Sequence, residues 1–270
     1  MEKGLLYLVP VDFTPVSISS SKFAAHLSKE NDQVVLVHVV KSDDDRTAAE
    51  LKLTDFAKTH LEGFSNFSTR VIKGAVSTDI AVIAETLNAS MIILGTHGAS
   101  GLRKLFGSYA FKIVDNSKVP LIIVQEETVF NKIKKIVMTI DLQKESLQIV
   151  KSAARLSHMF GAEIILVGAR QDDSIFKRKM DLNLTVAGNF LDEHKIPYSV
   201  EFVEGKGFEE NIFQLCQDKN ADMLAATYYE SSFHVFTDSF VRGLANNNLG
   251  IPVLTLDSES TSFGGQYSFL

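Results

Sequence analysis

The stretch Leu5–Ser28, LLYLVPVDFTPVSISSSKFAAHLS, decides the fold because it contains a complete strand, turn and helix pattern. Its first seven residues form a continuous apolar run without polar alternation, which is typical of a strand buried on both faces. Thr14 is a favourable N-cap and Pro15 suits the first helical position, so the pattern predicts a helix after this turn. Phe23 and Leu27 give the helix an apolar stripe that would face the sheet.

The same pattern occurs a second time in the chain. The segment KIVMTIDLQKESLQIVKSAARLS, which begins at Lys135, aligns with the first stretch and places Asp141 at the position of Asp12. Further pairs of segments match at spacings that drift only from about 129 to about 132 residues. The sequence therefore predicts two tandem copies. We expect domains at 1–128 and 129–257 and a C-terminal tail at 258–270.

Each copy alternates apolar runs with helical patterns. The first copy has predicted strands at 5–11, 34–40, 68–74, 91–95 and 120–124, and predicted helices near 46–63, 77–88 and 108–117, beside the helix after Thr14. The second copy has predicted strands near 134–140, 162–169, 197–203, 221–227 and 251–256. Strands joined by helical crossovers form a parallel sheet with right-handed connections. The predicted fold class is α/β: two tandem five-stranded parallel-sheet domains of the open, doubly wound type, packed as an internal pseudo-dimer.

Composition limits the classes of function. The chain has 270 residues, of which 45% are hydrophobic and 22% charged, as in ordinary soluble globular proteins. A net charge of −6 without a concentrated basic face argues against nucleic-acid binding. No apolar segment approaches the roughly 20 residues that cross a bilayer, so we expect no membrane association and a cytoplasmic location. The single cysteine, Cys216, lies in an apolar-periodic run and is predicted to be a packed thiol.

The segment GTHGASGLRKLFGS, which starts at Gly95, directly follows a predicted buried strand. In open parallel sheets, ligands bind beyond the carboxyl ends of the strands where the strand order reverses, which selects this segment and the turn around Asp12. Glycines allow positive φ, and their N–H groups and the following helix N-terminus can form an anion-binding concavity. Two readings remain open here, a phosphate cradle and a sharply bent loop in which Ser108 is a plain N-cap.

Other chemical motifs are weaker. The Gly95 segment lacks the Gly-Lys-Ser/Thr ending of a Walker A loop and the GxGxxG spacing of a dinucleotide site. The histidines show no metal-ligand spacing with one another or with Cys216, and no nucleophile motif is recognisable. The three adjacent aspartates in KSDDDRTAAE are predicted to form an exposed turn before a helix. The boundary between the two copies is predicted to be solvated at Lys132, Lys134 and Lys135. We therefore expect no catalytic residues and no metal site.

Three segments carry a resemblance to a known family. PVDFTPVS, VVLVHVV and GTHGASGLRKLFGS, the last followed by KVPLIIV, resemble the universal stress protein family over nearly the whole chain, as two tandem domains. The resemblance implies an adenine nucleotide alpha hydrolase-like fold. Family members that bind ATP carry a glycine, two residues, a second glycine, nine residues, then Gly-Ser or Gly-Thr. Here Gly95, Gly98 and Gly107-Ser108 follow that order, with eight residues before Gly107.

The resemblance implies roles for particular residues. Gly95 and Gly98 would approach the ribose and phosphates, and Gly107 with Ser108 would hold the distal phosphates. Asp12 would sit at the adenosine end, and Val39, after the second strand, would border the base. The candidate cofactor-binding residues are Pro10, Val11, Asp12, Val39, Gly95, His97, Gly98, Arg103, Gly107 and Ser108. The missing residue shortens the loop by up to about 3.5 Å, which is either absorbed in the turn or closes the phosphate pocket.

The second copy lacks the glycine pattern. At a spacing of about 132, the three glycines fall on Thr227, Glu230 and Ser239. Threonine and serine resist positive φ, and Glu230 would place a negative charge where phosphates would lie. Because this copy keeps the strand and helix pattern, the fold does not require the glycines. We therefore predict that the second copy binds no nucleotide.

The leading hypothesis is a cytoplasmic stress-response protein whose first copy binds ATP, with or without Mg²⁺, and whose nucleotide adjusts conformation or partner choice. Catalysis would be limited to slow ATP hydrolysis, because no residue qualifies as a general base with a positioned partner. The alternative is a nucleotide-free interaction module that acts through homo-oligomer, dimer or partner contacts. In the family, pairing usually runs through the last strand, here VPLIIV and IPVLTL.

Overall fold

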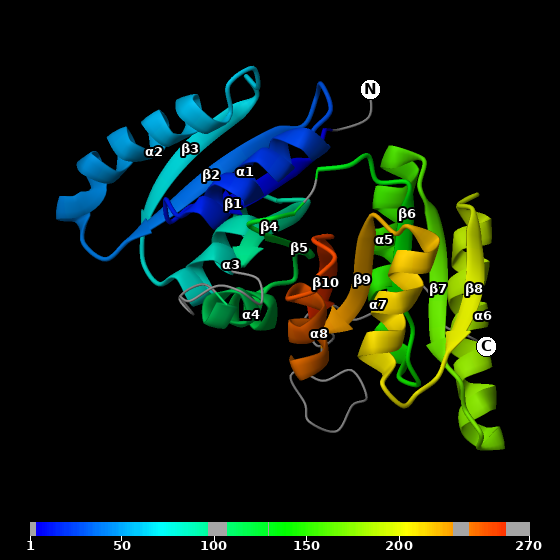
Figure 1. Ribbon diagram of the computed structural model, residues 1–270. Coiled ribbons are helices and arrows are strands. Elements are labelled where there is room, and N and C mark those ends of the chain that lie inside the picture. Colours follow the sequence, from blue (N-terminus) through cyan, green and yellow to red (C-terminus); the bar gives the residue numbers. More distant parts are fainter. Residues whose placement is uncertain (1–3, 97–106, 129, 229–237, 258–270) are drawn as a thin grey trace. The chain divides into compact units, whose positions relative to one another are not determined.

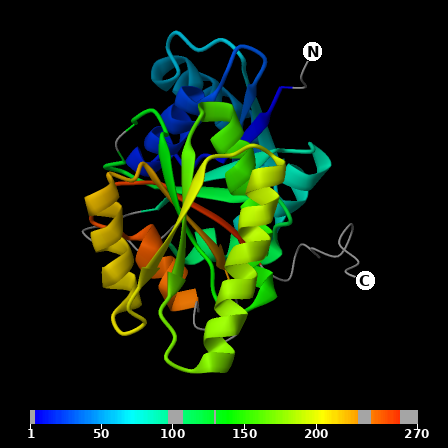
Figure 2. The same ribbon diagram turned by 90° about the vertical axis from the view of Figure 1, so that its right-hand side faces the viewer.

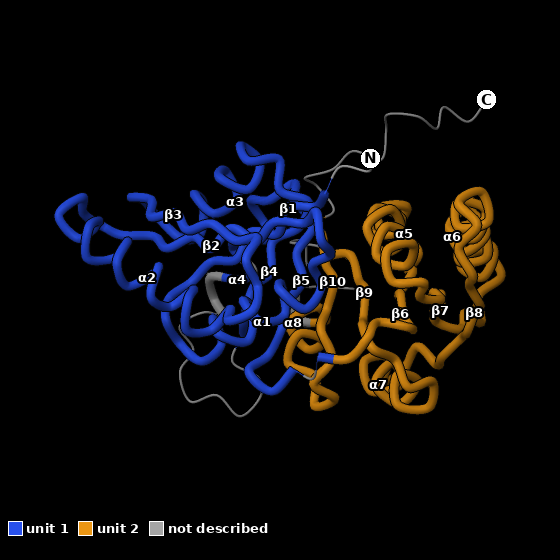
Figure 3. Tube along the Cα trace, turned by 90° about the horizontal axis from the view of Figure 1, so that it is seen from above, with its two compact units in different colours: residues 1–130 blue, residues 131–270 orange. Residues whose placement is uncertain are grey.

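The computed structural model describes residues 4–96, 107–128, 130–228 and 238–257. It divides into two compact units, Met1–Phe130 and Asn131–Leu270, shown in blue and orange in Figure 3. Each unit is described by itself below.

The first unit alternates strands and helices in the predicted order (Figure 1). Its elements are β1 (Leu6–Pro10), α1 (Pro15–Leu27), β2 (Gln33–Val40), the 3₁₀ turn η1 (Asp43–Asp45), α2 (Arg46–His60), β3 (Phe67–Lys73), α3 (Val76–Thr86), β4 (Met91–Thr96), α4 (Gly107–Asn116) and β5 (Leu121–Gln125). The strands form a parallel sheet in the order β3-β2-β1-β4-β5. Helices α1 and α2 pack on one face of this sheet, whereas α4 packs against β4 and α3 on the other (Figure 1).

The second unit repeats this topology. Its elements are β6 (Lys135–Thr139), the 3₁₀ turn η2 (Lys144–Leu147), α5 (Gln148–Phe160), β7 (Glu163–Ala169), α6 (Ser174–Glu193), β8 (Tyr198–Val203), α7 (Phe208–Lys219), β9 (Met223–Tyr228), α8 (Asp238–Ala245) and β10 (Val253–Asp257). The sheet is again parallel, in the order β8-β7-β6-β9-β10. Figure 3 shows α5 and α6 on one side of it and α7 on the other. The predicted α/β class with parallel sheets is confirmed.

The core of each unit is its sheet. Strands β4, β5 and β9 are buried along their whole length, as the continuous apolar runs predict. Cys216 is 2% exposed within α7, so the predicted packed thiol is confirmed. The three aspartates form the exposed turn η1, where Asp43 pairs with Lys73 at 3.0 Å. Among the described residues, no helix combines the length and apolar character that spanning a membrane requires.

The start of α1 differs from the prediction in one respect. Thr14 is the N-cap residue and Pro15 follows it at the first helical position, as predicted. The Thr14 hydroxyl does not cap the helix, however, because it donates a hydrogen bond to Asp12 Oδ1 at 2.6 Å. The acidic side chain two residues earlier therefore organises this helix start.

Candidate functional site

The candidate site lies at the carboxyl edge of the first unit's sheet, where the strand order reverses. Strand β1 pairs in parallel with β2 on one side and with β4 on the other. The turn after β1 and the segment after β4 therefore leave the sheet at adjacent points of the same edge. This is the position at which open α/β sheets bind ligands.

Asp12 is the centre of a hydrogen-bond network in the turn after β1. Its Oδ1 accepts hydrogen bonds from the Thr14 N–H at 3.0 Å, from the Thr14 hydroxyl, and from the Ser17 hydroxyl. The Asp12 N–H in turn donates to Ser17 Oγ at 2.9 Å. One carboxylate oxygen is thus committed to the turn, and the negative charge sits where the dipole of α1 favours it. Asp12 is half-buried, so its second oxygen remains at the site.

Phe13 adopts a left-handed backbone conformation with φ of 67°. For an aromatic residue this region is strained, and such strain is found preferentially in turns and functional sites. The Phe13 ring lies 4.6 Å from the ring of His38, measured between centroids, and 5.8 Å from that of Phe56 in α2. The ammonium of Lys52 lies 4.1 Å from the Phe13 centroid, within cation–π range. These contacts hold the turn in its strained form.

His38 was missed by the sequence analysis. Its Nδ1 lies 2.7 Å from the Val11 carbonyl oxygen. Because that oxygen can only accept, Nδ1 carries the proton of this hydrogen bond. The available signal was a polar ring that interrupts the otherwise apolar strand VVLVHVV.

The other candidates from β1 and β2 lie close to this cluster. Pro10 is the last residue of β1 and is buried. Val11 is 3% exposed, and its N–H donates to the Val37 carbonyl at 2.8 Å, so its backbone donor is used within the sheet. Val39 lies inside β2 and not after it, and it is half-buried near the carboxyl edge. The structure therefore brings Pro10, Val11 and Asp12 to one edge with Val39.

Gly95 is required by the packing of the first unit. It lies inside β4, and it is not among the residues with positive φ. A Cβ atom on Gly95 would lie 2.0 Å from Val16 Cγ1 and 2.7 Å from the Val16 carbonyl oxygen. Glycine is needed here because the first turn of α1 packs directly on β4. This requirement exists without any ligand.

Thr96 is a second feature that the sequence analysis missed. It ends β4, is 2% exposed, and its hydroxyl has no hydrogen-bond partner among the described residues. A buried unpaired hydroxyl is costly and marks a place where a further polar group fits. Helix α4 begins at Gly107, as predicted, so Gly107 and Ser108 form its first turn. His97, Gly98 and Arg103 lie outside the described residues.

The equivalent turn of the second unit keeps the hydrogen-bond pattern but loses the strain. Asp141 Oδ1 accepts from the Gln143 N–H at 2.7 Å, and the Asp141 N–H donates to Ser146 Oγ at 3.3 Å. Asp141 is only 2% exposed, and Asn183 of α6 donates to its carbonyl. Leu142, at the position of Phe13, is not among the positive-φ residues. The aspartate is thus retained in both units for the turn itself.

The position of Gly95 is filled in the second unit. Thr227 is fully buried in β9, and its hydroxyl donates to the Ser146 carbonyl at 3.2 Å. A side chain fits there because the first turn before α5 is the 3₁₀ turn η2 and not an α-helical turn.

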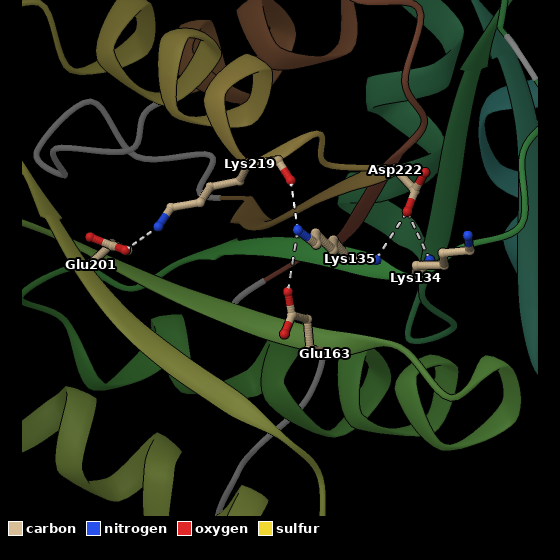
Figure 4. Close-up of polar contacts among 6 residues, drawn as sticks. All are labelled: Lys134, Lys135, Glu163, Glu201, Lys219 and Asp222. Carbon is tan, nitrogen blue, oxygen red and sulfur yellow. Dashed lines mark hydrogen bonds and ion pairs between the residues drawn. The ribbon is translucent and has the colours of Figure 1, made fainter.

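The boundary lysines belong to a structural network on the opposite edge of the second sheet (Figure 4). The backbone N–H groups of Lys134 and Lys135 both donate to Asp222 Oδ2, at 2.8 and 3.0 Å. The Lys135 ammonium lies 3.0 Å from the Lys219 carbonyl oxygen and 3.7 Å from Glu163. Lys219 pairs with Glu201, which raises the pKa of Lys219 above its usual value. The Lys135 ammonium is thus held within this network, whereas Lys134 takes part through its backbone alone.

Replacement of Asp12 by alanine should destabilise the first unit in the absence of any ligand. Asp12→Ala removes the acceptor of three hydrogen bonds at the start of α1, which costs about 1–2 kcal/mol. The loss is measured by urea denaturation. Asp12→Asn is the control, because it keeps Oδ1 and should recover most of the stability. Equal stability of Asp12→Ala and the unmodified chain would show that the network has no energetic role.

The first unit is thus an open α/β domain whose parallel sheet reverses its strand order beside the Asp12 turn. The family model "Universal stress protein family" matches residues 7–125. The first unit is therefore similar to the universal stress protein family over most of its length.

Individual proteins agree with this assignment. A universal stress protein of Methanocaldococcus jannaschii is 26% identical over 137 residues, which cover 44% of this chain and 81% of that protein. A universal stress protein of Archaeoglobus fulgidus DSM 4304 has a similar structure, with a TM-score of 0.69, 16% identity, and coverage of 96% of this chain and 100% of its own. A protein of unknown function from Pseudomonas aeruginosa PAO1 gives a TM-score of 0.59, 14% identity, and coverage of 93% and 92%. The last two likenesses show the fold.

Proposed function

We propose that this chain is an ATP-binding regulatory protein of the stress response, and that the nucleotide is held by the first unit alone. The observation that carries the proposal is that β4, after which the glycine segment begins, ends at the same sheet edge as β1 and the Asp12 turn that follows it. The match of residues 7–125 to the universal stress protein family supports a nucleotide as the ligand of this edge. The site residues would bind and orient the nucleotide, with Mg²⁺ as its counterion, and the cytoplasm is the expected location.

The electrostatics of the edge fit an anionic ligand. Helices α1 and α4 both begin here, at Pro15 and Gly107, and each N-terminus carries about half a positive charge. Backbone N–H groups at such termini bind phosphate oxygens. The buried Thr96 hydroxyl adds a donor at the end of β4. One carboxylate oxygen of Asp12 accepts three hydrogen bonds from its own turn. Asp12 lies after β1, where the adenosine would be placed.

The second unit lacks the features on which this proposal rests. Thr227 fills the position of Gly95, Asp141 is buried, and Leu142 replaces the strained Phe13. Glu230, at the position of Gly98, would repel a phosphate charge by about 4 kcal/mol at 4 Å and an effective dielectric constant of 20. We therefore propose that residues 129–257 form a second, diverged domain that binds no nucleotide. Residues 1–128 would be the nucleotide-binding domain, followed at the end of the chain by a tail of residues 258–270.

The test is the effect of ATP on thermal stability. ATP at a hundred times its Kd should raise the free energy of unfolding by about 2.7 kcal/mol and the Tm of the first transition by several degrees. Gly98→Glu, which introduces the charge of the second copy, should abolish the rise. Ala99→Glu is the control for an added charge on the same segment away from a glycine. Native mass spectrometry of freshly purified protein checks for bound nucleotide.

Two results would contradict the proposal that the first unit binds ATP. One is a Tm that millimolar ATP, ADP and AMP all leave unchanged. The other is an equal ATP-induced rise in Gly98→Glu and in the unmodified chain. Turnover of ATP above about 1 s⁻¹, the low end for enzymes, would overturn the regulatory assignment.

One observation favours a second candidate, a nucleotide-free interaction module. The packing of Val16 against Gly95 explains that glycine without a ligand. In this case, partners captured by the full chain would be the same with and without ATP. Pairing through β5 and β10, as the family resemblance implies, is part of both candidates and remains a prediction.

A further inference from the structure

The edge strand of the second unit is unusually exposed and apolar. Val200 and Phe202 in β8 are 42% and 37% exposed. Their equivalents in β3, at a spacing of 131 residues, are the polar Thr69 and the 9% exposed Val71. In the first unit α2 covers the edge strand, and the exposed Arg70 lies between these two positions. Both β3 and β8 end their sheets, so the two units differ in how well a helix covers the face of the end strand.

Two glycines explain why α6 leaves β8 uncovered. Gly168 in β7 lets α6 pack close to the sheet, because a Cβ there would lie 2.9 Å from Met180 Sδ. The equivalent position in the first unit carries the bulky ring of His38. Gly188 lets the far end of α6 contact Tyr198, whose hydroxyl donates to Asp192 at 3.1 Å. Helix α6, the long yellow-green helix of Figure 2, is thus tied to β7 and to the start of β8.

A groove follows where α6 and β8 diverge. A cavity of about 390 Å³ lies between them and is lined on the strand side by Tyr198, Val200 and Phe202. A neighbouring cavity of about 410 Å³ continues from Phe202 to the end of β7. On α6 itself, Ile175 and Leu182 are 74% and 60% exposed. The apolar side chains of β8 line this groove together with the polar Asp181, Thr185 and Asn189 of α6. Exposed apolar residues with a polar rim mark interaction sites.

The backbone of β8 can accept another strand. The carbonyls of Pro197 and Val203 bond to N–H groups beside β7, at Ile164 and Arg170. In a parallel strand, the N–H and C=O of one residue point to the same side, and the side alternates from residue to residue. Because the odd-numbered Pro197 and Val203 point toward β7, the N–H and C=O groups of the even-numbered residues of β8 point away from β7. Among the described strands, β8 is the end of its sheet. It contains neither proline nor lysine, the residues that commonly block an open edge.

We propose that β8 is an interface with a second copy of this chain, formed by antiparallel β8–β8 pairing about a two-fold axis at Val200. This register places Val200 opposite Val200 and Phe202 opposite Tyr198 of the second copy, all on the groove side. Aromatic and β-branched cross-strand pairs of this kind are favourable. The acid Glu201, on the other side and paired with Lys219, falls opposite Ser199, so no like charges face each other. An isologous contact of this kind closes as a dimer.

The charged residues of α6 are arranged so that the same two-fold axis would bring opposite charges together. The two copies of this helix would run antiparallel, so the amino-terminal part of one would lie beside the carboxyl-terminal end of the other. The exposed cations Lys177, Arg178 and Lys179 would then be near the exposed Asp192 and Glu193 of the second copy. Complementary charge of this kind fixes the register of an interface more than its affinity.

The test is the oligomeric state of the full chain, measured by sedimentation equilibrium. The unmodified chain should be a dimer at about 50 µM, and Val200→Lys should weaken the dimer at least about tenfold, because a lysine on an edge blocks pairing. Thr69→Lys, the equivalent change in β3, is the matched control and should leave the dimer intact. A monomeric unmodified chain, or a Val200→Lys dimer of unchanged affinity, would overturn the proposal. A monomer that instead captures an added extended peptide would also overturn it.

A cross-link tests the register if Val200→Lys fails to fold. Opposed residues of a hydrogen-bonded antiparallel pair have Cα atoms about 5.5 Å apart, within reach of a short bis-maleimide. Val200→Cys should therefore give a covalent dimer at micromolar concentration, whereas Thr69→Cys should not. The native Cys216 is buried and does not compete for the reagent. Absence of cross-linking in Val200→Cys would rule out the two-fold register.

Discussion

Gly95→Ala should lower the stability of the first unit by about 2–3 kcal/mol, although it adds a single methyl group. The new Cβ would lie 2.0 Å from Val16 Cγ1 and 2.7 Å from the Val16 carbonyl oxygen. The side chain of Val16 can rotate, but the carbonyl belongs to the first turn of α1 and moves only with the helix. For a unit of this size the expected fall in Tm is roughly 6–12 °C, measured by differential scanning calorimetry.

The same substitution at another glycine provides the control. A Cβ on Gly205 would find its nearest atoms at 3.9 and 4.0 Å, so Gly205→Ala should change stability by less than about 0.5 kcal/mol. Val16→Ala in the Gly95→Ala background should restore part of the loss, because it removes the closest atom. Additive effects of Val16→Ala and Gly95→Ala would show that the two residues do not press on each other and that the close packing is wrong.

This packing changes how the glycine pattern is interpreted. Gly95 would be required by the approach of α1 to β4 in a chain that binds nothing, so it carries no information about nucleotides. The phosphate-binding hypothesis therefore depends on Gly98 and Gly107. For this reason Gly98→Glu, and not a change at Gly95, separates binding from folding.

The fold was predictable because its signals are local. Continuous apolar runs marked the strands, and the element bounds differ from the predicted ones by a few residues at most, as for β9, which begins at Met223 and not at 221. The internal repeat identified both sheets, because each copy was read against the other. Asp12 was found by its position after β1, and its repeat at Asp141 is explained by the same turn geometry.

Other features depend on contacts that a single sequence does not display. The strain at Phe13 and its contact with His38 join residues from different elements, and periodicity gives no sign of them. The role of Gly95 depends on how closely one helix approaches one strand. The exposure of Phe202 depends on the tilt of α6, which Gly168 permits. In each case a tertiary distance decides the role of the residue, and local pattern constrains that distance weakly.

Cys216 should be almost unreactive in the folded chain, with a rate of alkylation at pH 8 about three orders of magnitude below that of the unfolded chain. Burial raises the pKa of this thiol from about 9 to about 12, because the thiolate cannot be solvated inside the second unit. An unfolded thiol has a pKa of about 8.5, and only the thiolate reacts. The measurement is the rate of iodoacetamide labelling with and without denaturant. Gln217→Cys in a Cys216→Ser background is the control, since that exposed neighbour in α7 should react at the unfolded rate.

The same pKa predicts an alkaline loss of stability. Below pH 8.5 the thiol is protonated in both states, so its contribution is fully present. Above that pH the unfolded chain releases the proton while the folded chain keeps it until about pH 12, so folding becomes less favourable as the pH rises. The slope is about 1.4 kcal/mol per pH unit from this group. Cys216→Ala removes this pH dependence. The contribution of the thiol is therefore the difference in the free energy of unfolding between the unmodified chain and Cys216→Ala, measured from pH 8.5 to pH 11. Parallel curves would mean that the thiol is solvated and that α7 does not seal the core of the second unit.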